Sequence, residues 1–428
     1  MRRNLILHIG LPKTGTSAIQ HFLVTRRKAL LRQGFCYPNT PGGSNHVTMA
    51  LAAAYHDRPR KWIEEVRQKG LPVPPSTGEF WQQFTDEMES LGPDTRTVIL
   101  SAERFSGQLD SQEKIANLRA ALDPLFDNIR VIVYLRRQDT HATSAYSQML
   151  RFGIIAPPAL EQPTSRYKSF YDYEAFLGRW SEVFGRDAIA PRIFERAAML
   201  EGDAVADFIA QCQIPKVRPA PPDVAMRNQS INIEGQALLI AVGRLMREQS
   251  GSEKIAGKIW DELTDIVSDT CAGQGWRPSR GEAHAFMANY SASNEAVRRA
   301  WFPGRATLFD MKDSDLPETP VAMDPQPLAL AGTIVLEALR RGVQADSEVR
   351  LSKAQVALAL GQKDKAGILL QKAVRLNGDN VDARLALARH MADVGQTAGA
   401  LEHAEAALHA RPTSRAARKL LEELGADP

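Results

Sequence analysis

Two short segments of the chain carry residues that could bind phosphate. In the first, residues 10–17 read Gly-Leu-Pro-Lys-Thr-Gly-Thr-Ser, with Lys13 between Gly10 and Gly15. Glycines let the backbone turn sharply, so that its N–H groups and the N-terminus of a following helix can face an anion. The Lys13 ammonium could neutralise that anion. Hydroxyl groups that could add hydrogen bonds are those of Thr14, Thr16 and Ser17.

The second segment places an arginine and a serine eight residues apart. Arg136 follows an apolar run that ends at Leu135, and Ser144 lies on the helix expected after it. A guanidinium and a hydroxyl can converge on one phosphate group. Because Arg137 is adjacent, the spacing leaves open which of the two arginines makes the contact.

Group transfer to a hydroxyl also needs a base, for which there are two candidates. Glu103 follows a predicted strand, at the edge of a parallel sheet where ligands gather. His46 follows Ser-Asn in a loop at the start of a helix. We rank Glu103 first. The competing interpretations are an ion pair of Glu103 with Arg104 or with residues 136–137, a capping role for His46, and a satisfied core position for His8.

The elements that must position these residues alternate between strands and helices. Apolar runs typical of buried parallel strands span 5–9, 97–100 and 130–135, and 188–194 is a candidate edge strand. Residues with helical spacing separate these runs. The pattern predicts an α/β domain over residues 1–302, a P-loop-like, mostly parallel sheet flanked by helices.

A Pro-rich stretch, 303–330, is expected to link this domain to an all-α segment, 331–428. In that segment small residues recur with a period of 34 residues. The recurring pairs are Gly361 and Gly395, Ala366 and Ala400, and Ala373 and Ala407. The period resembles that of tetratricopeptide repeats, with copies over 347–380 and 381–414. About three repeats are usually needed for stability, so we expect 331–428 to depend on the rest of the chain or on a partner, or to self-associate.

The composition excludes several classes of protein. The 428 residues include 53 basic and 50 acidic side chains, a net charge of +3, which is too balanced for a general nucleic-acid binder. Three widely spaced cysteines with no Cys/His cluster indicate a reducing compartment and no metal site. No apolar run reaches the roughly 20 residues that a membrane helix needs, and no signal peptide is evident. We expect a cytoplasmic protein with no membrane span.

The two phosphate segments resemble those of sulfotransferases. Residues Pro12-Lys13-Thr14-Gly15-Thr16 are similar to the motif that holds the 5′-phosphosulfate of 3′-phosphoadenosine 5′-phosphosulfate. The segment from Arg136 to Ser144 is similar to the one that binds the 3′-phosphate, although Arg137-Gln138 stand where many members have Asn-Pro. The resemblance, closest to bacterial members, extends over about residues 1–310.

This resemblance implies a sulfuryl transfer to a hydroxyl or amine of an acceptor, with no obligatory metal. Lys13 would stabilise the leaving phosphate, and a Ser-x-Glu segment like the one ending at Glu103 is common in bacterial members. Family analogy suggests a carbohydrate or glycoconjugate as acceptor.

Two other functions remain open at the level of sequence. The first is a nucleotide or small-molecule kinase, which is disfavoured because Thr16 stands where the G-x-x-x-x-G-K-[ST] loop has its lysine. The second is a nucleotide-binding interaction protein that works through its helical repeats. Both anion segments and a candidate base are present, which argues against the second.

Overall fold

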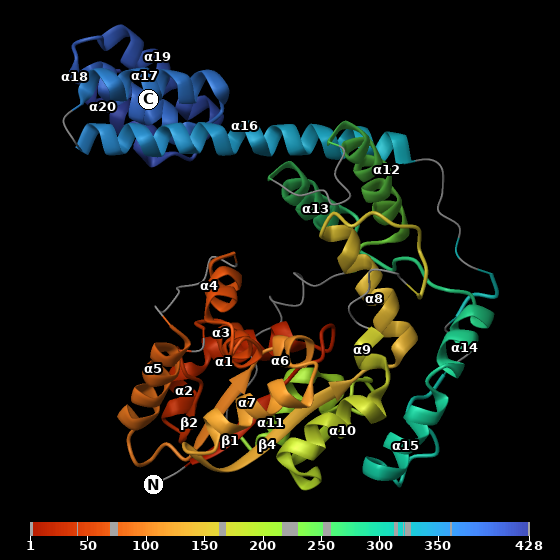
Figure 1. Cartoon of the computed structure of the whole chain (residues 1–428). Helices are drawn as coiled ribbons and strands as arrows, with labels where there is room; N and C mark the ends of the chain where they lie inside the picture. The colour runs from red at the N-terminus through yellow and green to blue at the C-terminus, as the bar shows by residue number, and fades with distance from the viewer. Residues whose placement is uncertain are drawn as a thin grey trace. The chain divides into compact units, whose positions relative to one another are not determined.

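The computed structural model describes residues 3–40, 42–68, 76–161, 168–215, 230–250, 258–311, 316–319, 321, 327–359 and 362–426 (Figure 1). The chain divides into two compact units. The N-terminal unit contains Met1–Ile255 and Cys271–Met323, and the C-terminal unit contains Ala256–Thr270 and Asp324–Pro428. We describe each unit by itself.

The N-terminal unit is built on a five-stranded sheet in the order β2-β3-β1-β4-β5. All neighbouring strands are parallel, which confirms the predicted α/β class. In β1, His8 lies opposite Ser101 of β3 on one side and Ile132 of β4 on the other. The strands are β1 (Arg3–His8), β2 (Phe35–Cys36), β3 (Thr97–Ser101), β4 (Phe126–Leu135) and β5 (Ile189–Ile193).

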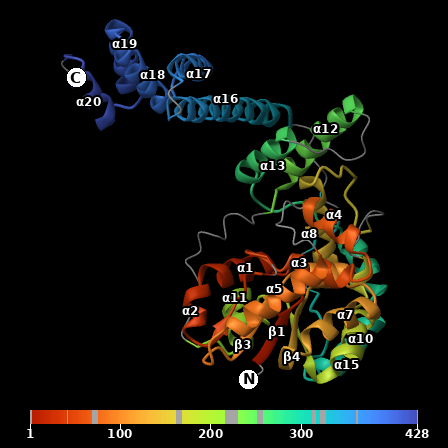
Figure 2. The same ribbon diagram turned by 60° about the vertical axis from the view of Figure 1, so that its left-hand side comes forward.

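Helices cover both faces of this sheet because side chains of a strand alternate between its faces (Figure 2). Leu5 and Leu7 of β1 lie in the larger core, and Ile6 lies in a smaller core on the opposite face. The smaller core is covered by α1 (Thr16–Thr25), α2 (Arg27–Leu31) and α11 (Ala204–Gln211). The larger core is covered by α3 (Val47–Ala54), α4 (Pro59–Gln68), α5 (Thr77–Ser90), α6 (Arg104–Gln108), α7 (Gln112–Leu122) and α10 (Tyr173–Phe184).

The remaining helices of this unit follow β4 and β5 in the chain. They are α8 (Gln138–Arg151), α9 (Lys168–Tyr171), α12 (Ile233–Ser250), α14 (Arg280–Ala288) and α15 (Ser291–Trp301), with 3-10 turns at Arg186–Ala188 and Leu200–Gly202. The chain after α15 stays on the core. Leu308 and Phe309 are buried there, and the Phe309 ring lies 6.0 Å from that of Tyr173. Part of the stretch predicted to be a linker therefore packs on the sheet domain.

The C-terminal unit consists of helices. They are α13 (Lys258–Thr270), α16 (Pro327–Ala359), α17 (Lys363–Leu376), α18 (Val381–Asp393), α19 (Thr397–Ala410) and α20 (Arg415–Glu423). α16 starts within the predicted linker and ends inside the first predicted repeat, whose second half is α17. α19 begins and ends 34 residues after α17. The alanines that recur with this period are buried, as close packing between helices requires: Ala366, Ala373, Ala400 and Ala407. None of the described helices is both long enough and apolar enough to cross a membrane.

Candidate functional site

The parallel sheet brings the predicted phosphate segments and the predicted base to one edge. β1, β3 and β4 are neighbours, and their carboxyl ends lead into the loop at 9–15, Glu103 and Arg136 respectively. Backbone bonds continue past the strand ends, since Ala102 N–H donates to the His8 carbonyl at 3.1 Å and Tyr134 N–H donates to the Gly10 carbonyl at 3.0 Å. This edge, where connections leave the central strand in both directions, is where ligands bind in open α/β sheets.

The loop between β1 and α1 has the backbone of an anion-binding turn. Lys13 and Gly15 both have positive φ angles, 62° and 79°. Left-handed residues alternating with right-handed ones bring successive N–H groups to one side of the chain. The N–H groups of residues 13–17 donate to no acceptor in the described part of the chain. Five consecutive donors at a helix N-terminus thus remain available to an anion.

Close packing on both sides explains the two glycines. Gly10 has a φ of 100°, and a Cβ there would lie 3.1 Å from Glu103 Cα. A Cβ on Gly15 would lie 2.8 Å from Ala204 Cβ. The Thr14 hydroxyl donates to the Leu11 carbonyl at 2.6 Å, so its hydrogen is used inside the loop. Thr16 is buried, with its hydroxyl 3.4 Å from the same carbonyl, and Ser17 is exposed.

Two arginines influence the protonation of Lys13 at this edge. Burial lowers the pKa of the Lys13 ammonium, and the positive charges of Arg151 and Arg136 lower it further, whereas the Glu103 carboxylate opposes the shift. Arg151 is the last residue of α8. The positive charges of Lys13, Arg136 and Arg151 repel one another, and an anion bound at the N–H groups of residues 13–17 would reduce this repulsion.

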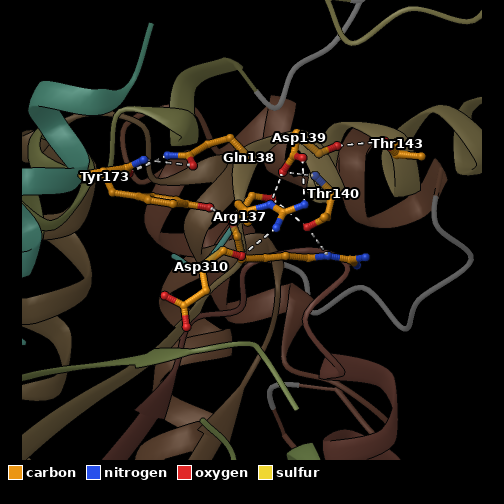
Figure 3. Close-up of polar contacts among 9 residues, drawn as sticks. Arg137, Gln138, Asp139, Thr140, Thr143, Tyr173 and Asp310 are labelled. Atoms are coloured by element: carbon orange, nitrogen blue, oxygen red, sulfur yellow. Dashed lines mark hydrogen bonds and ion pairs between the residues drawn. The ribbon is translucent and has the colours of Figure 1, made fainter. Parts of the chain in front are cut away.

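The surroundings of the two adjacent arginines differ, and Figure 3 shows those of Arg137. Arg137 forms a bidentate pair with Asp139, at 2.7 Å from Nε and 3.0 Å from Nη2, and its Nη1 donates to the Asp310 carbonyl at 2.8 Å. Arg136 instead donates from Nη1 to the Lys13 carbonyl at 2.8 Å. Its guanidinium also lies 5.7 Å from the centre of the Phe194 ring. The geometry therefore favours Arg136 as the arginine of the anion site. Ser144 is half-buried in the second turn of α8.

Glu103 is the better placed of the two candidate bases. It precedes α6, and its backbone carbonyl accepts a hydrogen bond from the Ser106 hydroxyl at 2.7 Å. Its half-buried carboxylate makes no hydrogen bond or ion pair with any described residue. Neither of the ion pairs considered from sequence, with Arg104 or with residues 136–137, is present in this part of the chain.

His46 is held by the backbone at both ring nitrogens. Nδ1 accepts from the Ser101 N–H at 3.0 Å, and Nε2 donates to the Pro38 carbonyl at 3.2 Å. Complete burial lowers the pKa of His46 to about 3. In this arrangement neither nitrogen is available to a substrate proton, so we do not propose His46 as the base.

His8 lies in the core, as expected, but its hydrogen bonding is incomplete. Nδ1 lies 2.8 Å from the Ser101 hydroxyl, while Nε2 has no partner among the described residues. The ring packs against Tyr134 and Phe208, at 5.9 and 5.3 Å between ring centres. These apolar surroundings lower the pKa of His8 to about 3.

Sequence reasoning missed two side chains that hold the site. The Tyr173 hydroxyl donates to the Arg136 carbonyl. His141, on the buried face of α8, lies with Nε2 2.9 Å from the Pro12 carbonyl. The signal for His141 was its position five residues after Arg136, on the face of α8 that also carries Gln138 and Ala145. Among described residues, no group of three or more His, Cys, Asp or Glu side chains could hold a metal ion.

No protein-family model matches the chain. An uncharacterized protein of Archaeoglobus fulgidus is 33% identical over 88 residues, which are 20% of this chain and 23% of the relative, so the match spans about a quarter of that protein. A sulfotransferase from Alicyclobacillus acidocaldarius is similar over 70% of this chain and 95% of its own, at 12% identity and a TM-score of 0.36.

Proposed function

We propose that this chain is a sulfotransferase that uses 3′-phosphoadenosine 5′-phosphosulfate as donor. One observation carries the proposal. Five consecutive unpaired N–H groups at the start of α1 lie beside two cations, Lys13 and Arg136, and beside an unpaired carboxylate, Glu103, among the described residues. Anion binding, stabilisation of a leaving phosphate and removal of a proton are what sulfuryl transfer requires.

Each side chain has a role in the proposed reaction. The loop at 10–17 binds the 5′-phosphate, and Arg136 with Ser144 binds the 3′-phosphate. The bond between sulfur and the bridging oxygen breaks, and a bond from sulfur to the acceptor oxygen or nitrogen forms. Glu103 takes the acceptor's proton, and Lys13 stabilises the negative charge left on 3′-phosphoadenosine 5′-phosphate. These steps use no metal ion.

The acceptor and the C-terminal unit complete the proposal. By analogy with the family that the two motifs resemble, the acceptor is a hydroxyl or amine of a carbohydrate or glycoconjugate. Arg151, whose charge acts on Lys13, would suit an anionic acceptor. We propose that the helices within 331–428 bind a protein partner or a second copy, as tetratricopeptide-like repeats do, and that the protein works in the cytoplasm.

The first test is calorimetric titration with 3′-phosphoadenosine 5′-phosphate in the absence of magnesium. We expect micromolar binding to the wild type and an affinity that is lower by tenfold or more in Lys13→Ala and in Arg136→Ala. Lys28→Ala and Arg60→Ala, which remove exposed cations, serve as matched controls and are expected to bind like the wild type. If ATP with magnesium binds and the bisphosphate does not, the kinase hypothesis replaces this one.

A further inference from the structure

Two consecutive carbonyl groups of the anion-binding loop are held from the segment that follows β4. The Pro12 carbonyl accepts from His141 Nε2 at 2.9 Å, and the Lys13 carbonyl accepts from Arg136 Nη1 at 2.8 Å. A carbonyl that turned inward would place its negative end beside a bound phosphate. Holding these two carbonyls toward α8 therefore helps to leave the N–H groups of residues 13–17 for the anion.

The contacts of His141 define its protonation. The Pro12 carbonyl can only accept, so the hydrogen must be on Nε2. Nδ1 then accepts from the Tyr171 hydroxyl at 3.0 Å. Burial, together with the positive charges of Arg136 and Lys13, lowers the pKa of His141 to about 3, so the ring is neutral near pH 7. His141 therefore contributes a hydrogen bond to the loop and no charge.

Tyr171 is itself fixed by helices far along the chain. Its backbone carbonyl accepts from Gln138 Nε2 at 3.0 Å, and Gln138 also donates to Asn294 of α15 at 2.7 Å. The Tyr171 ring packs edge-on against Phe286 and Tyr290, at 5.9 and 5.6 Å between ring centres. The orientation of His141 is thus imposed by α9, α14 and α15, and not by the loop that it holds.

We propose that His141 is a positioning residue for the donor site, which fixes the Pro12 carbonyl so that the loop receives the 5′-phosphate. The inference rests on the proposed function, because it assigns the loop to the donor's 5′-phosphate. It also gives the C-terminal helices of the sheet domain, α14 and α15, a connection to that loop through Tyr171.

Two substitutions separate this role from a general structural one. In His141→Gln the amide nitrogen can take the place of Nε2 and still donate to Pro12, whereas in His141→Asn the shorter side chain cannot reach that carbonyl. We expect 3′-phosphoadenosine 5′-phosphate to bind His141→Gln within about threefold of the wild type and His141→Asn about tenfold more weakly, the range for a lost buried hydrogen bond. The affinity of His141→Asn for adenosine 5′-phosphate should fall by the same factor. Its affinity for adenosine 3′-phosphate should equal that of the wild type.

Each outcome of the titrations decides a different claim. If the wild type does not bind the bisphosphate, the proposed function fails. If the wild type binds it and both variants bind equally well, or if affinity for adenosine 3′-phosphate falls as much as that for the 5′-phosphate, the role of His141 is overturned. If His141→Asn does not fold, as judged by circular dichroism, Tyr171→Phe carries the test. The affinity of Tyr171→Phe for 3′-phosphoadenosine 5′-phosphate and for adenosine 5′-phosphate should fall about threefold, and its affinity for adenosine 3′-phosphate should not change. An unchanged affinity for the first two ligands would overturn the inference.

Discussion

At the scale of single residues, the site combines charges that oppose one another before a ligand binds. The burial of Lys13, together with the charges of Arg151 and Arg136, lowers the pKa of its ammonium, and the Glu103 carboxylate opposes this shift. A bound dianion would add to the effect of Glu103 and raise the pKa of Lys13 again. Donor binding is therefore expected to take up protons wherever free Lys13 is partly deprotonated.

The role of Glu103 can be tested without changing the shape of its side chain. Glu103→Gln removes the proton acceptor but keeps the volume, so turnover should fall by two or more orders of magnitude while the affinity for 3′-phosphoadenosine 5′-phosphate stays intact. Sulfuryl transfer from a labelled donor measures turnover, and calorimetry measures affinity. Glu113→Gln changes an exposed carboxylate and should leave both unchanged. Near-normal turnover in Glu103→Gln would assign the base elsewhere.

Substitution of Arg136 should affect donor binding, whereas substitution of Arg137 should affect stability. Arg136→Ala is expected to weaken donor binding. Arg137→Ala leaves Asp139, whose side chain is 2% exposed, without its bidentate partner, and is expected to lower the free energy of unfolding by about 3 kcal/mol. Urea unfolding and calorimetry on both variants separate the effects. A loss of donor affinity in a stable Arg137→Ala protein would reverse the assignment.

At the scale of elements, the turn from β1 to α1 depends on contacts that only glycine allows. Gly15 combines a φ of 79° with an approach that would place a Cβ 2.8 Å from Ala204 Cβ. The start of α1 therefore lies against the start of α11, and the direction of the helix N-terminus is set by this contact. Backbone conformation and packing act together on the anion site.

Gly15→Ala should disturb both stability and binding. We expect the free energy of unfolding to fall by about 1–3 kcal/mol, from the left-handed conformation and the clash, and the affinity for the bisphosphate to fall at least tenfold. Gly178→Ala, in the interior of α10 where a Cβ meets nothing within 4 Å, is the matched control and should stabilise by about 1 kcal/mol. Chemical unfolding and calorimetry would measure both, and an unaffected Gly15→Ala would contradict the described geometry.

At the scale of the whole molecule, three fully buried histidines make stability depend on pH. Burial lowers the pKa values of His8, His46 and His141 to about 3, below the value of about 6.5 expected after unfolding. Between these values the unfolded chain binds more protons, so the free energy of unfolding must fall as the pH falls.

We expect each of these histidines to lower the free energy of unfolding by about 1.4 kcal/mol for each pH unit below pH 6.5. Urea unfolding at several pH values between 7 and 5 would measure the slope. His8→Leu removes one of the three histidines. The free energy of unfolding should then change less steeply with pH, by about 1.4 kcal/mol per pH unit, which corresponds to one proton. A free energy of unfolding that stays constant from pH 7 to pH 5 would show that the histidines are not buried in the neutral form.

The C-terminal helices give a second prediction at this scale. α13 belongs to the C-terminal unit although it lies before 331 in the chain, and Arg341 Nη1 is 3.8 Å from Asp269 Oδ2 of that helix. An isolated segment 331–428 lacks α13 and the start of α16. We expect it not to unfold cooperatively as a stable monomer in thermal or urea unfolding. A cooperative transition of the isolated monomer would show that it is independent of the rest of the chain.

The sequence by itself determined the parallel α/β class and the composition of the anion loop. Both are local properties, because an apolar run of strand length and two glycines on either side of a lysine are patterns of residues that are close together in the chain. The 34-residue spacing of the buried alanines was visible in the same way. Glu103 was expected at a strand end, and its place beside Lys13 follows from the order of parallel strands.

Only the tertiary structure decided which of the expected residues remain available for chemistry. Arg137 is bound by Asp139 and by the distant Asp310 carbonyl, and His46 is bound by Ser101, 55 residues away. The contact of His141 with Pro12 joins residues 129 apart in sequence. Such contacts arise where strands that are distant in the chain end side by side, so no local pattern of residue types records them.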